Sequence, residues 1–210
     1  MESLSKQYYA YVERLENIVY ENIAIKLATF KGFDESLKLS LKNTVRDFPL
    51  LYFIVESLQI DCVLTISKLT EKNKGGKTFV EFFNFASSNI KAISKVYPKL
   101  TPAVIDANNK SLIEVSQQIE RIKKQRDKYY AHSDNEYFLE HNKLLIDFPE
   151  TYKDMVDIII ELQNIISSHR LIIKGNRIIC MSDFAYLNTF KTMELLKEAN
   201  DEWYKNYRAH

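Results

Sequence analysis

The scarcity of glycine and proline limits the folds open to this chain more than any other feature of its sequence. Only 4 Gly and 4 Pro occur among 210 residues, whereas average usage would place these two residues at about 12% of positions. Tight turns depend on them, so barrels, sandwiches and most α/β folds are disfavoured. The sequence therefore predicts an all-α protein that is built from long helices.

The spacing of apolar residues supports this interpretation. Between Leu51 and Leu69 they recur every three or four residues, which is typical of a helix with one buried face. Thr78 and Glu81 have the spacing of a capping box, which marks the start of a helix. We expect an antiparallel bundle of about six helices, at residues 4–29, 36–71 with a break near Pro49, 78–96, 102–132, 149–173 and 183–207.

The domain organisation is predicted to be simple. No internal repeat or change of composition divides the chain, so we expect one helical domain over residues 1–210, with 176–210 as a less diagnostic helical extension. The segment from Leu171 to Met181 is rich in β-forming residues around Gly175. A short hairpin is therefore expected there.

Charge and cysteine content suggest where such a protein works. The 29 basic and 28 acidic residues nearly cancel, so no global field draws the chain to nucleic acid or membrane. Cys62 and Cys180 stand far apart and fit a reduced compartment. The most apolar run, Leu50 to Ile66, contains Glu56 and Asp61 and is not a membrane span. We expect a cytoplasmic protein with no membrane association.

One basic segment carries most of the functional information. Residues 121–132 hold five fixed cations, one acid, two aromatic residues and a histidine. The apolar stripe of the preceding helix leads directly to Arg126, whereas Arg121, Lys124 and Lys128 fall on other faces, where a charge is readily hydrated. The residues of that stripe are Leu112, Val115, Ile119 and Ile122.

A guanidinium on a buried stripe needs a partner or a polar cleft. One interpretation is a buried ion pair of Arg126, with Asp61 or Glu56 of the helix at 36–71 as its acid. The other is a phosphate-binding group, because a planar guanidinium matches phosphate oxygens with paired hydrogen bonds. The charge pattern alone leaves both interpretations open.

His132 adds a second chemical group to this segment. Its ordinary pKa near 6.5 suits proton transfer close to neutral pH. An arginine for phosphate charge and a histidine for a proton are sufficient for metal-free RNA cleavage by the RNA's own 2′-hydroxyl. On a straight helix the two side chains lie roughly 120° apart, so they meet only if the helix ends or unwinds near Ala131, or if a second subunit completes the site.

The run Arg126-Asp127-Lys128-Tyr129-Tyr130-Ala131-His132, followed by Ser133-Asp134, resembles the signature of the HEPN superfamily, and most closely its phage abortive-infection, AbiU-like branch. A second segment, 66–71, is similar to the Arg-Leu-Thr-Asp stretch of that branch. In it Lys68 replaces the arginine and Glu71 replaces the aspartate, which keeps both charges. The resemblance covers roughly residues 5–170.

The resemblance implies a helical bundle that forms a homodimer, with two copies of the motif facing each other across a cleft. In active members this composite site is a metal-independent endoribonuclease of toxin-antitoxin or antiphage defence, so RNA and an antitoxin protein are the expected partners. Carried over to this chain, Arg126 would stabilise the pentacovalent phosphate, Asp127 would orient its partners, and His132 would act as general base or acid.

Further RNA contacts are expected beside these three residues. Lys124 and Lys128 are candidates for phosphate contacts, and Tyr129 and Tyr130 for base stacking. Packing at a dimer interface is the other interpretation of the two tyrosines. No metal or cofactor is expected, since the spacing of His132 and its acidic neighbours matches no familiar metal site. A non-catalytic RNA-binding or protein-interaction module of the same fold is the alternative function.

Overall fold

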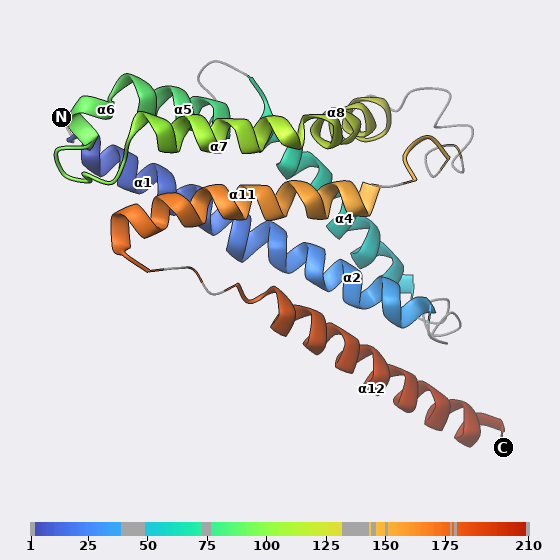
Figure 1. Cartoon of the computed structure of the whole chain (residues 1–210). Coiled ribbons are helices and arrows are strands. Elements are labelled where there is room, and N and C mark those ends of the chain that lie inside the picture. The colour runs from blue at the N-terminus through green and yellow to red at the C-terminus, as the bar shows by residue number, and fades with distance from the viewer. Residues whose placement is uncertain are drawn as a thin grey trace. The chain divides into compact units, whose positions relative to one another are not determined.

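The computed structural model describes residues 3–38, 49–72, 77–131, 143, 146–149, 151–176, 178 and 180–208. Every regular element within these ranges is a helix, which confirms the predicted all-α class (Figure 1). The elements are α1 (Leu4–Glu16), η1 (Asn17–Ile23), α2 (Ala24–Lys38), α4 (Pro49–Thr70), α5 (Phe79–Ser88), α6 (Ile90–Ile93), α7 (Pro102–Glu114), α8 (Ser116–Gln125), η2 (Arg126–Ala131), α11 (Thr151–Lys174) and α12 (Ser182–Arg208).

The chain divides into two compact units. The first comprises Met1–Val19 and Cys62–Ile179, and the second Tyr20–Asp61 and Cys180–His210. In the first unit α11 runs antiparallel to α7 and α8 and packs against both (Figure 1). Its buried side chains include Met155, Ile158 and Leu162. The basic segment that carries the motif, of which the structure describes residues 121–131 and which is called the motif segment below, therefore belongs to the first unit, where α11 supports it.

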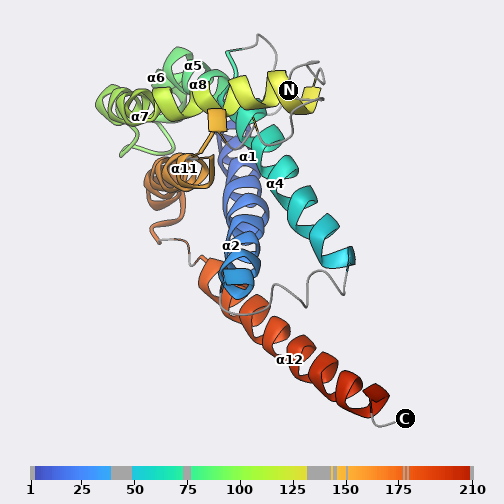
Figure 2. The same cartoon turned by 90° about the vertical axis from the view of Figure 1, so that its right-hand side faces the viewer.

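The second unit is held together mainly by α2 and α12, which pack closely against each other (Figure 2). Gly32 lies inside α2, although the helices expected from the sequence, at 4–29 and 36–71, leave it between them. A Cβ atom at this position would lie 2.9 Å from the Cβ of Thr189 on α12. Close approach of the two helices therefore explains the glycine, and α2 continues through it to Lys38.

The structure changes the bounds of several predicted helices. The helix expected over 36–71 with a break near Pro49 is confirmed from Pro49 to Thr70 as α4. Residues 36–38 belong to α2 instead, and residues 39–48 lie outside the described residues. The helix expected over 78–96 is split at Asn89, and the one over 102–132 at Val115. The hairpin expected from Leu171 is excluded because α11 continues to Lys174, beyond which Gly175 takes a positive φ of 71°. Thr78 caps α5 as predicted, since its Oγ1 accepts a hydrogen bond from the Glu81 backbone at 3.2 Å.

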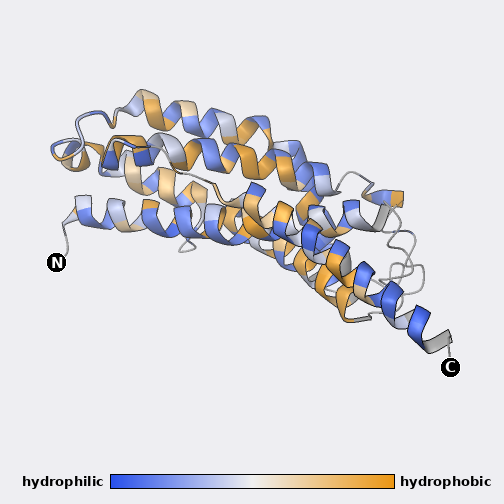
Figure 3. Cartoon of the chain, turned by 90° about the horizontal axis from the view of Figure 1, so that it is seen from below, coloured by the Kyte–Doolittle hydropathy of each residue, from blue (hydrophilic) through white to orange (hydrophobic). Residues whose placement is uncertain are grey.

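Hydrophilic and hydrophobic residues alternate along the helices (Figure 3), as expected where each helix packs one face against its neighbours. None of the described helices is both long enough and apolar enough to cross a bilayer. This finding agrees with the charged residues that interrupt the apolar run in α4.

The core of the first unit contains one polar cluster around His169, which is fully buried. Its Nδ1 lies 2.6 Å from the Tyr8 hydroxyl, and its Nε2 lies 3.0 Å from the amide nitrogen of Asn108. An amide nitrogen can only donate, so Nε2 accepts and Nδ1 carries the ring's single hydrogen. Burial lowers the pKa of His169 to about 3.

This cluster predicts that the protein loses stability on mild acidification. The pKa of His169 is about 3 in the folded state and about 6.5 in the unfolded state. Stability is therefore complete above pH 6.5 and falls as the pH drops towards 3, by about 2 kcal/mol between pH 7 and pH 5. Urea unfolding at the two pH values measures this loss. A His169→Gln variant should lack this part of the pH dependence, and an equal slope in both proteins would contradict the assignment.

Candidate functional site

The motif segment is carried by α8 and the π-helical turn η2 that follows it. The apolar stripe predicted from the sequence is buried as expected, at Leu112, Val115, Ile119 and Ile122. These side chains anchor the segment to its own unit. Arg126 continues the stripe, and its side chain is only 19% exposed.

Two carboxylates hold the Arg126 guanidinium. Its Nε donates to Asp127 Oδ1 at 2.8 Å, and its Nη1 donates to Glu71 Oε1. The hydrogen bond to Asp127 is the main cause of a raised pKa at Arg126; Glu71 adds to it, while burial opposes it. Glu71 is itself mostly buried, with 25% of its side chain exposed. Arg126 is therefore a fully charged group held in one place.

The partner of Arg126 is not one of the two acids suggested by the sequence. Asp61 instead forms an ion pair with Lys26 at 2.5 Å. The acid that contacts Arg126 is Glu71, just beyond the end of α4, which is the position where the resemblance placed an acidic residue. The structure thus brings together, at Glu71 and Arg126, the two segments on which the resemblance depends.

Lys123 strengthens the same junction. Its ammonium donates to the Thr70 carbonyl, 3.3 Å away, at the C-terminus of α4. A cation at a helix C-terminus is favoured by the helix dipole and satisfies a carbonyl that has no partner within the helix. Lys123 and Arg126 lie three residues apart, so both reach the end of α4 from one face. Two cations three residues apart, together with an acid just after the end of α4, are the sequence signal that could have revealed Lys123.

The remaining predicted residues are only partly placed. Lys124, Lys128 and Asp127 are exposed at the surface beside Arg126. Tyr129 and Tyr130 belong to η2, but their side chains are not among those that the structure describes. His132 follows η2 directly and lies outside the described residues, so its distance from Arg126 stays a prediction.

The π-helical turn changes the geometry expected between arginine and histidine. The separation of roughly 120° assumes α-helical rotation up to His132, but residues 126–131 pair in the wider π pattern. Such turns are rare and occur often at functional sites. Here the turn begins at Arg126 and ends one residue before His132.

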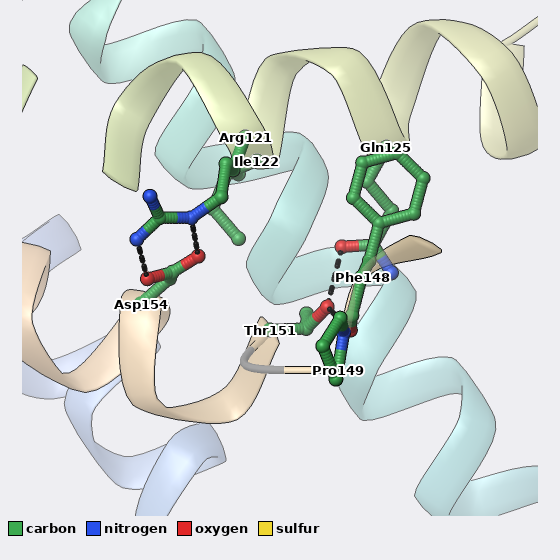
Figure 4. A pocket seen from close by; sticks show the side chains of 7 residues that line it. All are labelled: Arg121, Ile122, Gln125, Phe148, Pro149, Thr151 and Asp154. Atoms are coloured by element: carbon green, nitrogen blue, oxygen red, sulfur yellow. Dashed lines mark hydrogen bonds and ion pairs between the residues drawn. The ribbon is translucent and has the colours of Figure 1, made fainter. Parts of the chain in front are cut away.

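Arg121 has a structural role that the sequence pattern did not reveal. It was expected on a hydrated face, but its Nε and Nη2 donate to the two oxygens of Asp154 at 2.7 and 2.6 Å (Figure 4). Only 4% of the Asp154 side chain is exposed, against 42% for Arg121. This bidentate pair ties α8 to the first turn of α11 and so helps to place η2.

Comparison with known proteins assigns the family. A family model described as AbiU2, of the HEPN type, matches residues 5–205. Curated proteins and solved structures were also compared, and neither search found a match. The match covers nearly the whole chain, including both segments that meet at Arg126 and Glu71. The protein belongs to the AbiU2 family of HEPN-type abortive-infection proteins.

Proposed function

We propose that the protein is a metal-independent endoribonuclease of abortive-infection defence, and that Arg126, Asp127 and His132 form its active site. The observation that supports this most is the guanidinium of Arg126. It is held by Glu71 and Asp127 at the start of a π-helical turn that leads directly to His132. The family assignment agrees with an abortive-infection role.

The contacts of Arg126 leave hydrogen-bond donors for a phosphate. A guanidinium has five N–H groups. Nε and Nη2 contact Asp127, and Nη1 contacts Glu71, so two N–H groups have no acceptor among the described residues. Lys124 and Lys128, two residues away on either side in the chain, are exposed. A phosphodiester bound there would receive charge-assisted hydrogen bonds that strengthen as charge grows on its oxygens in the transition state.

The reaction needs no protein nucleophile. A general base removes the proton from the RNA 2′-hydroxyl, the O2′–P bond forms, and the P–O5′ bond breaks. A general acid protonates the departing 5′-oxygen, which leaves a cyclic phosphate and a 5′-hydroxyl. His132 supplies one of these proton transfers, and in a homodimer the second copy of His132 supplies the other. An antitoxin that covers this surface would inhibit both subunits.

One observation favours a second candidate, a non-catalytic RNA-binding or protein-interaction module. Arg126 and Glu71 form a largely buried ion pair between two segments of the first unit, and this is also what a purely structural arginine would do. RNA cleavage separates the two candidates, since the module would bind RNA or a protein without cutting it.

The direct test is cleavage of single-stranded RNA by the purified protein in EDTA. We expect products that end in a cyclic phosphate or a 3′-phosphate, because the 2′-hydroxyl is the nucleophile. An RNA with 2′-deoxyribose at the cut position should resist cleavage. Light scattering on the same sample should give about twice the chain mass of 24.7 kDa. Cleavage that strictly requires Mg²⁺, or none on any RNA, would contradict the proposal.

A further inference from the structure

A small cavity lies beside the motif segment, between α8 and the start of α11. Its volume is about 170 Å³, and it is lined by Arg121, Ile122, Gln125, Phe148, Pro149, Thr151 and Asp154 (Figure 4). This is below the 300–1,000 Å³ of usual small-molecule pockets, so it fits one small planar group. All its lining residues belong to the first unit.

Gln125 is the most informative residue of this cavity. It is 1% exposed, and its Oε1 lies 3.1 Å from the Thr151 hydroxyl. The amide nitrogen points away from that hydroxyl and has no acceptor among the described residues (Figure 4). Among the described residues, the buried side-chain polar atom left without a hydrogen bond is Ser67 Oγ, so the Gln125 amide nitrogen is accessible from the cavity and free to donate there. A ligand with an acceptor in the cavity would satisfy it.

The other walls indicate a flat, weakly polar ligand. Phe148, Pro149 and Ile122 add apolar surface. Asp154 and Arg121 already satisfy each other through two hydrogen bonds, so they demand no charged ligand. Proteins hold an unstacked RNA base with an aromatic ring, other apolar side chains and an amide that forms hydrogen bonds with the edge of the base.

We infer that this cavity binds one nucleobase of the RNA, next to the nucleotide whose phosphate contacts Arg126. Gln125 and Arg126 are consecutive residues that point about 100° apart, towards Thr151 and Glu71 respectively, so base and phosphate would be bound on two neighbouring faces of one segment. The Gln125 amide would recognise a base edge that presents an acceptor, and Phe148 would stack on the ring. This inference rests on the proposed function, because it assumes that RNA is the substrate.

Binding of RNA that cannot be cleaved tests the inference separately from catalysis. Short homopolymers of A, C, G and U with 2′-O-methyl groups would be titrated by fluorescence anisotropy at one fixed salt concentration. We expect the wild-type protein to prefer one base about tenfold, and Gln125→Leu to lose that preference. Gln117→Leu, on the exposed side of the same helix, is the matched control and should keep it. Phe148→Ala should weaken binding of every homopolymer several-fold and serves if Gln125→Leu does not fold.

The outcomes separate this inference from the proposed function. Equal binding of all four homopolymers by the wild-type protein, or a preference unchanged in Gln125→Leu, overturns the base pocket even if RNA is cleaved in EDTA. A preference that depends on Gln125 in a protein that cuts no RNA supports the pocket and contradicts the ribonuclease.

Discussion

Replacing His132 by alanine is expected to lower the rate of RNA cleavage by at least about 100-fold, because general acid-base groups contribute about 10²–10⁴-fold. Arg126→Ala should have a comparable effect, since the phosphate charge and the proton transfer act in one step, and the double variant should be little worse than either single one. Initial cleavage rates in EDTA measure both effects. Lys91→Ala, an exposed cation of α6, is the control and should cleave like the wild type.

Because Arg126 forms an ion pair with Glu71, Arg126→Lys separates its role in catalysis from its role in stability better than Arg126→Ala does. A lysine keeps a positive charge opposite the largely buried Glu71, so we expect it to lose less of the free energy of unfolding than the about 3–5 kcal/mol that removal of a buried partner costs. It cannot reproduce the planar set of donors that matches a phosphate, so cleavage should still fall. Urea unfolding and cleavage would be measured on the same samples. A folded His132→Ala protein with wild-type cleavage would defeat the mechanism, and full activity in Arg126→Lys would remove the guanidinium from it.

The largest loss of stability is expected from Arg121→Met. This change leaves the buried Asp154 carboxylate without its bidentate partner, and an uncompensated buried charge costs about 3–5 kcal/mol. Methionine retains an aliphatic stem at this position, so the loss would reflect the ion pair more than packing. Urea unfolding at pH 7 measures the difference from the wild type.

The two residues of this ion pair differ in exposure, so their substitutions should differ in cost. Arg121 remains 42% exposed, so Asp154→Asn leaves a cation that water can hydrate, and it should cost less than Arg121→Met. Combining the two substitutions should recover part of the loss, because the buried charge is then absent. A loss below about 1 kcal/mol for Arg121→Met would show that the pair does not hold α8 on α11.

The His169 cluster is a feature that the sequence pattern could not predict. Its residues, Tyr8, Asn108 and His169, come from α1, α7 and α11. Each occupies an ordinary helical position, and no spacing along the chain marks the three as neighbours. The cluster could not be predicted because it depends on which helices pack together and at what register.

The sequence alone determined the helical class, the buried stripe that ends at Arg126 and the resemblance that the family match confirms. These features follow from local rules, since glycine and proline content and apolar spacing act within one helix. Only the tertiary structure decided that Arg126 meets Glu71 instead of Asp61, and that Arg121 meets Asp154. An ion pair depends on the distance between two helices in space, and a helical pattern specifies which face is buried but not what lies opposite it.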